Sequence, residues 1–170
     1  MKLGGKWLQL NRLDMKISTV YKYDGFSREC LLRFKDGNDR WLLNIFLSPY
    51  LLQFYFKFYK YTIVAVPSHI SASERRGYIP THELCRSLKL PLECDVLMKK
   101  HPYKQSTMHR SVRENIKDVI MLNDIDKIRG KHILLFDDLV TTGHTLRACY
   151  ELLEPYVLSI QVFALFHHDI

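Results

Sequence analysis

Residues 133–145 form the part of the chain with the clearest chemical pattern. Four apolar residues precede Asp137 and Asp138, and two more apolar residues lead into Thr-Thr-Gly-His-Thr. The backbone N–H groups and hydroxyls of residues 141–145 can surround a phosphate at the start of a helix, and Gly143 permits close approach. Two carboxylates can accept hydrogen bonds from neighbouring sugar hydroxyls. A sugar phosphate would therefore satisfy both halves of the segment.

Each half of this pattern also has a simpler explanation. Paired aspartates at a strand end occur in receiver domains and phosphatases, and a Thr-Thr-Gly turn can merely cap the next helix. The complete ordered pattern resembles the phosphoribosyl pyrophosphate signature of type I phosphoribosyltransferases. The resemblance implies a catalytic role for Asp137 and Asp138. It implies substrate-binding roles for the loop residues Thr141, Thr142, Gly143, His144 and Thr145, with the ring of His144 expected in solvent.

The elements that must position this segment follow from the alternation of sequence patterns. β-Branched and apolar runs predict strands at residues 18–23, 61–66, 94–98, 131–136 and 158–166. Helical spacing predicts helices at residues 26–35, 41–58, 81–88 and 143–153, the second of them interrupted at Pro49. This alternation favours an α/β fold. The family resemblance implies the type I phosphoribosyltransferase fold, a mainly parallel central sheet flanked by helices, with a small hood.

Length, charge and cysteine content limit the class of protein. The 170 residues, 47% of them hydrophobic, suffice for one compact domain. Within it we expect residues 1–60 to form an N-terminal hood or lead-in region and residues 61–170 the phosphoribosyltransferase core. The net charge of +7 suits anionic partners, although solvated lysines explain it equally well. The scattered cysteines, without C-x-x-C spacing, predict reduced thiols in a cytoplasmic protein.

Export and membrane insertion are not predicted. The N-terminus lacks an apolar run followed by a cleavage site, and prolines and lysines divide the apolar residues 45–67 into short pieces. We expect no membrane span. His167 and His168 have no third ligand at a suitable spacing, so they are predicted to be surface or edge-strand residues.

Motifs outside the central segment resemble those of the competence protein ComF family. They are Val66-Pro67, Arg75-Arg76-Gly77-Tyr78, Gln105 with Arg113 and Asn115, Tyr21-Lys22-Tyr23-Asp24, Arg33-Phe34-Lys35 and Asp39-Arg40. The resemblance runs from about Trp7 to the C-terminus. The given sequence lacks the N-terminal zinc module that is usual in the family, and Arg113 stands one residue closer to Asn115 than usual.

This resemblance assigns further site residues. It implies a pyrophosphate-binding loop that includes Pro67, Ser68, Arg75 and Arg76, and a mobile hood loop in which Gln105 binds substrate and Arg113 is catalytic. The reaction implied is displacement of pyrophosphate from the anomeric carbon toward an unidentified acceptor. Magnesium is the implied cofactor, held indirectly by Asp137 and Asp138 through ribose hydroxyls or water.

Two functions from different classes remain open. The first is an enzyme, a phosphoribosyltransferase that acts on an unidentified acceptor. In the purine-salvage members an Asp occupies the position of Thr141, so hypoxanthine and guanine are disfavoured as acceptors. The alternative is a non-enzymatic protein of competence and DNA uptake that binds single-stranded DNA, for which residues 54–61 supply aromatic rings. The resemblance suggests a competence helicase and a DNA-processing protein as partners. A homodimer is also possible in this fold.

Overall fold

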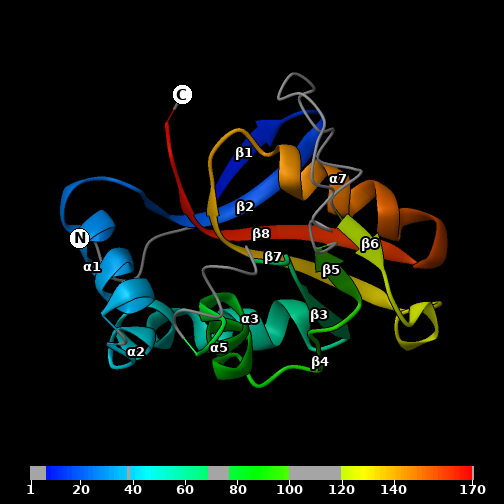
Figure 1. Ribbon diagram of the computed structural model, residues 1–170, viewed down its shortest axis with the longest axis horizontal. Coiled ribbons are helices and arrows are strands. Elements are labelled where there is room, and N and C mark those ends of the chain that lie inside the picture. Colours follow the sequence, from blue (N-terminus) through cyan, green and yellow to red (C-terminus); the bar gives the residue numbers. More distant parts are fainter. Residues whose placement is uncertain (1–6, 38, 69–76, 100–119, 170) are drawn as a thin grey trace, which may run out of the picture.

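The computed structural model describes residues 7–37, 39–68, 77–99 and 120–169. Its centre is a six-stranded sheet in the order β1-β2-β8-β7-β3-β4 (Figure 1). The strands are β1 (Leu8–Arg12), β2 (Met15–Lys22), β3 (Tyr61–Ala65), β4 (Leu92–Glu93), β7 (His132–Val140) and β8 (Ser159–His167). β1 and β2 form an antiparallel hairpin, and the other neighbouring pairs are parallel. The predicted mainly parallel α/β sheet is confirmed.

Helices cover both faces of this sheet. On one face lie α1 (Gly25–Asp36), α2 (Leu42–Leu47), α3 (Leu51–Phe58) and α5 (Pro80–Ser87), and on the other lies α7 (His144–Leu153) (Figure 1). A short 3-10 helix, η1 (Ser48–Tyr50), separates α2 from α3 at Pro49, as predicted. Further 3-10 turns are η2 (Ile125–Lys127) and η3 (Glu154–Tyr156).

Strand β7 shows how the sheet divides the core into two layers. Leu134 and Phe136 belong to the cluster under the α1, α2, α3 and α5 helices, whereas Ile133 and Leu135 belong to the cluster under α7. Successive side chains on a strand point to opposite faces, which produces this alternation. All four side chains are fully buried. A strand that is covered on both faces needs a continuous apolar run, which this sequence supplies.

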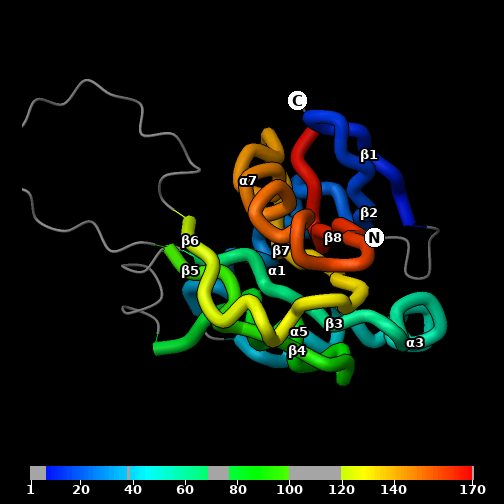
Figure 2. The backbone as a smooth tube through the Cα atoms, turned by 90° about the vertical axis from the view of Figure 1, so that its right-hand side faces the viewer, coloured from blue at the N-terminus to red at the C-terminus, as the bar shows by residue number. Residues whose placement is uncertain are grey.

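A second sheet joins β5 (Leu97–Lys99) to β6 (Ile120–Leu122) as an antiparallel pair. Figure 2 shows this pair on the opposite side of the molecule from α3. It flanks residues 100–119, where the hood loop with Gln105 and Arg113 was predicted, and these residues lie outside the described part of the chain.

The N-terminal strands extend the same sheet, because β2 pairs in parallel with β8 along most of its length. Met15 and Ile17 of β2 are buried under α7, and Tyr21 is buried under the opposite helices. The predicted boundary at residue 60 therefore does not coincide with an edge of the sheet. The division into a lead-in region and a core stays a prediction.

The prediction for His167 was wrong. Its side chain is buried in β8, a strand with neighbours on both sides, and Nδ1 lies 3.3 Å from Oγ1 of Thr19. His168, by contrast, is exposed. The cysteines Cys30, Cys85, Cys94 and Cys149 are free thiols, as predicted. Within the described ranges, no helix has the length and hydrophobicity needed to cross a bilayer.

Candidate functional site

The candidate site lies at the carboxyl edge of the parallel strands. β7 ends with Asp137 and Asp138 followed by Leu139 and Val140, and α7 begins after the short loop at residues 141–143. β3 pairs in parallel with β7, so the residues after β3 reach the same edge. Ligands of open α/β sheets bind outside this edge.

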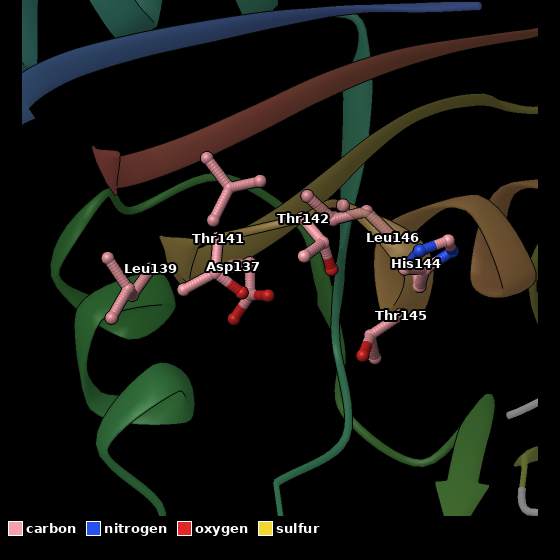
Figure 3. A pocket seen from close by; sticks show the side chains of 9 residues that line it. Asp137, Leu139, Thr141, Thr142, His144, Thr145 and Leu146 are labelled. Carbon is pink, nitrogen blue, oxygen red and sulfur yellow. The ribbon is translucent and has the colours of Figure 1, made fainter. Parts of the chain in front are cut away.

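A small cavity of about 40 Å³ lies against the loop between β7 and α7. Its lining comprises Asp137, Leu139, Val140, Thr141, Thr142, Gly143, His144, Thr145 and Leu146. Figure 3 shows Asp137, Thr142 and Thr145 on one side of the loop, while the ring of His144 points away from Asp137. His144 is exposed, as expected. The cavity therefore presents mainly hydroxyls and one carboxylate.

Gly143 shapes this loop. It has φ +88° and caps α7, a left-handed conformation that residues with a Cβ rarely adopt. The first amide that bonds within the helix is that of Arg147, which donates to the carbonyl of Gly143 at 2.9 Å. The amides of residues 143–146 therefore have no acceptor inside the helix, and they are the donors that a bound anion would use.

A larger cavity of about 240 Å³ adjoins the first. Its lining comprises Lys35, Val66, Pro67, Ser68, Thr81, Lys99, Asp137, Asp138 and Thr145. Two lysines and two aspartates thus face a cavity with few apolar groups. Asp137 and Thr145 line both cavities, so one ligand could occupy the two and touch both residues.

The two aspartates differ in their surroundings, although the sequence pattern treats them as an equivalent pair. Asp138 is buried, and its Oδ1 accepts a hydrogen bond from Lys35 at 2.6 Å. Its Oδ2 accepts one from the Thr81 hydroxyl at 3.1 Å. Asp137 is half-buried, and its Oδ1 accepts a hydrogen bond from the amide of Asp138 at 2.8 Å.

Electrostatics also alters the protonation of Asp137. Burial, followed by the charge of Asp138, raises the pKa of Asp137 to about 7, against the opposing effect of Lys35 and Lys99. Burial lowers the pKa of Lys99, and the nearby Asp137 partly offsets this. The site thus contains a carboxyl group that changes charge near neutral pH.

Arg12 supports the loop at residues 141–143 from the N-terminal hairpin. Its guanidinium donates to the carbonyl oxygen of Thr141 and, at 2.5 Å, to that of His168. A Cβ on Gly143 would lie 3.5 Å from Cβ of Arg12, so this side chain packs directly behind the loop. Arg147 of α7 donates in turn to the carbonyl of Leu13 at 3.2 Å. The hairpin and the loop therefore hold each other in place.

The structure brings part of the predicted site together. Pro67, Ser68, Asp137, Asp138 and the loop residues 141–145 line the two cavities. The predicted residues Arg75, Arg76, Gln105 and Arg113 lie outside the described ranges. Sequence reasoning did not assign site roles to Arg12, Lys35 and Thr81, which reach the site from separate elements.

The sheet, its acidic strand end and the hydroxyl-rich loop define the type I phosphoribosyltransferase fold. Comparison with known families agrees, because residues 51–168 match the model described as phosphoribosyl transferase domain. The chain belongs to this family.

Two curated relatives refine the assignment. The chain is 31% identical over 131 residues to the competence protein ComFC of Bacillus subtilis, covering 75% of this chain and 53% of the relative. It is 33% identical over 90 residues to the hypoxanthine phosphoribosyltransferase of Salmonella typhimurium, covering 51% of this chain and 47% of the relative. The chain thus spans about half the length of both. The predicted ComF-like character is confirmed.

Among solved structures, the chain is similar to the hypoxanthine phosphoribosyltransferase of Trypanosoma cruzi. The TM-score is 0.44 at 17% sequence identity, covering 75% of this chain and 66% of that one. A similarity of this size has no bearing on the substrate.

Proposed function

We propose that this protein binds phosphoribosyl pyrophosphate and transfers its phosphoribosyl group, displacing pyrophosphate from the anomeric carbon. One observation carries the proposal: Asp137 and Thr145 line both the small cavity and the larger one. A ligand with a phosphate in the small cavity would place its sugar beside Asp137 and its second charged group in the larger cavity. Phosphoribosyl pyrophosphate has this distribution of charge.

The residues would divide the work by their position. The amides of residues 143–146 and the hydroxyls of Thr142 and Thr145 would bind the 5-phosphate. The carboxylate of Asp137 would accept a hydrogen bond from a ribose hydroxyl and stabilise positive charge as the bond to pyrophosphate breaks. Ser68 and Lys99 line the cavity on the pyrophosphate side. The roles proposed for Arg75, Arg76, Gln105 and Arg113 rest on the family resemblance.

Magnesium fits the site as an ion that arrives with the substrate. Within the described part of the chain, no group of three or more His, Cys, Asp or Glu side chains is arranged to hold a metal. Magnesium in phosphate sites commonly needs only one or two carboxylates, with substrate oxygens and water as its other ligands. Asp137 would hold it through water or the ribose hydroxyls, while Asp138 is already engaged by Lys35. When bound, it would neutralise charge on the departing pyrophosphate.

The proposal extends to the acceptor, the location and the assembly. Thr141 carries a hydroxyl that cannot act as a general base near neutral pH. Purine salvage therefore stays disfavoured, although one relative is a hypoxanthine phosphoribosyltransferase. A cytoplasmic location and a homodimer are consistent with the family.

The test of this function is a calorimetric titration with phosphoribosyl pyrophosphate and magnesium, followed by a pyrophosphate-release screen over nucleobases and amines. We expect saturable binding with a dissociation constant between about 1 μM and 1 mM, the usual range for enzyme substrates. Ribose 5-phosphate should bind as well, and binding should be lost when ribose replaces it as the titrant. No heat with either phosphorylated ligand would refute the proposal.

A second candidate function is binding of single-stranded DNA in competence and DNA uptake. The similarity to a competence protein supports it. So does helix α3, where Phe54 and Phe58 are buried but Tyr55, Phe56 and, directly after the helix, Tyr59 are exposed. Exposed rings next to lysines can stack on bases. Competence proteins would then be partners.

This second function predicts an affinity for single-stranded DNA that falls steeply with salt, because phosphate contacts release counterions. Fluorescence anisotropy of a labelled oligonucleotide at two salt concentrations measures it. Replacing Tyr55 and Phe56 by serine should weaken the binding, while Leu52→Ser on the same exposed helix surface serves as the control. A salt-independent affinity, or none, would exclude this function.

A further inference from the structure

The last turn of α1 stands next to the acidic strand end. Phe34 is fully buried in the core under the sheet, which fixes the orientation of this turn. The hydroxyl of Tyr78 donates to the carbonyl of Phe34 and, at 3.1 Å, to that of Lys35. The backbone that carries Lys35 is therefore held from two sides.

From this turn, Lys35 reaches the carboxylate of Asp138. Nζ lies 2.6 Å from Oδ1, and only 21% of the lysine side chain and 10% of the aspartate side chain are exposed. Thr81, in the first turn of α5, occupies the other carboxylate oxygen. Both oxygens of Asp138 thus already have protein donors, and a partly desolvated charge pair of this kind is lost only at a large cost.

The pleat of β7 explains why the aspartates do not act as a pair. Leu134 and Phe136 face the α1 and α5 side, and Asp138 continues their row before the alternation changes at Leu139 and Val140. Asp137 continues the opposite row of Ile133 and Leu135, beside α7 and the loop at residues 141–143. It is the carboxylate that borders both cavities.

We propose that Lys35 is a positioning residue of the site, which engages Asp138, fixes the end of β7 and leaves Asp137 as the carboxylate that contacts the sugar. This inference rests on the proposed function. It assigns a role to a residue of α1, outside residues 51–168 that match the family model. It also separates two adjacent aspartates into one that binds and one that is held.

The competing explanation is that Lys35 contacts the pyrophosphate directly, because it also lines the larger cavity. Ribose 5-phosphate distinguishes the two roles, since it has no pyrophosphate for a lysine to contact. A positioning role predicts that Lys35 affects the affinity for ribose 5-phosphate. A direct contact predicts an effect on phosphoribosyl pyrophosphate alone.

The experiment measures ribose 5-phosphate affinity by calorimetry for Lys35→Met, Asp138→Asn and the double variant. Either single change leaves one partly buried charge without its partner, so each should weaken binding by at least about 10-fold. The double variant removes both charges and should bind more tightly than the product of the two single effects predicts. Lys35→Arg keeps the ion pair and should retain most of the affinity. Lys131→Met, at an exposed lysine outside both cavities, is the control.

Each result decides between the possibilities. The role of Lys35 would be overturned if the loss of ribose 5-phosphate affinity in the double variant equalled the product of the two single losses. An unchanged ribose 5-phosphate affinity in Lys35→Met would overturn it too. If Lys35→Met does not fold, Asp138→Asn and the double variant still give a comparison: removing the lysine should restore affinity to Asp138→Asn, and a further loss of affinity would overturn the role of Lys35. A failure of the unaltered protein to bind ribose 5-phosphate would instead refute the proposed function, and this inference with it.

Discussion

Asp137→Asn is expected to weaken the binding of ribose 5-phosphate and phosphoribosyl pyrophosphate by about 10- to 100-fold. A hydrogen bond to a charged acceptor contributes about 1.5–3 kcal/mol, and the variant loses the charge while keeping the shape of the side chain. Asp137 is the carboxylate that borders both cavities, so no other described side chain is placed to replace it at that point. Calorimetry measures the loss.

The same variant should gain stability at neutral and higher pH. The pKa of Asp137 is raised from 3.8 to about 7 in the folded protein, mainly by burial and by the charge of Asp138. The folded state therefore binds more protons than the unfolded state between these values, and stability falls as the pH rises through this range. Removing the carboxyl group removes this loss, so the melting temperature should rise more at pH 8 than at pH 5.

Asp126→Asn is the control for this prediction, because that side chain is 89% exposed and lies outside both cavities. It should change neither ligand affinity nor the pH dependence of melting. An Asp137→Asn protein that binds ribose 5-phosphate as tightly as the unaltered protein would show that Asp137 does not contact the sugar. A lower melting temperature of Asp137→Asn than of the unaltered protein at pH 8 would show that the carboxylate of Asp137 is well stabilised in the fold.

Gly143→Ala is expected to weaken ribose 5-phosphate binding by about 10-fold, because a left-handed residue with a Cβ costs roughly 1–2 kcal/mol. The backbone can relieve this strain by turning, and the amides of residues 143–146 would then leave their positions. The added methyl itself meets no obstacle, since it would lie 3.5 Å from Cβ of Arg12. The effect is therefore one of backbone conformation.

Gly130→Ala provides a matched control. Gly130 also has a left-handed backbone, with φ +67° and nothing within 4 Å of an added Cβ, but it precedes β7 at the other end of the strand. Both variants should lose similar stability in thermal denaturation. A loss of ribose 5-phosphate affinity should appear in Gly143→Ala alone. Equal affinities in the two variants would argue against a phosphate site at the loop.

Much of the fold could be predicted because the signals are local. The apolar run of β7, the helical spacing of α7 and the break at Pro49 each lie within a short stretch of sequence. Strand β1 was missed because its hairpin turn carries no glycine: Leu13 and Asp14 both adopt positive φ, at 49° and 60°. Turns of that conformation are usually recognised by Gly or Asn.

The candidate site could be predicted only where its residues are contiguous. The loop at residues 141–145 is one segment, whereas Lys35 and Thr81 reach Asp138 across sequence separations of 103 and 57 residues. Arg12 is separated from Thr141 by 129 residues. Contacts of this kind depend on strand order, which the local patterns do not specify. The different environments of Asp137 and Asp138 follow from the strand pleat and the helix on each face.

A crystal structure of the protein with ribose 5-phosphate tests the central claim most directly. The phosphate should lie within hydrogen-bond reach of the amides of residues 143–146, with a ribose hydroxyl against the carboxylate of Asp137. A phosphate bound elsewhere, for example between Lys35 and Lys99 with the loop vacant, would contradict the account.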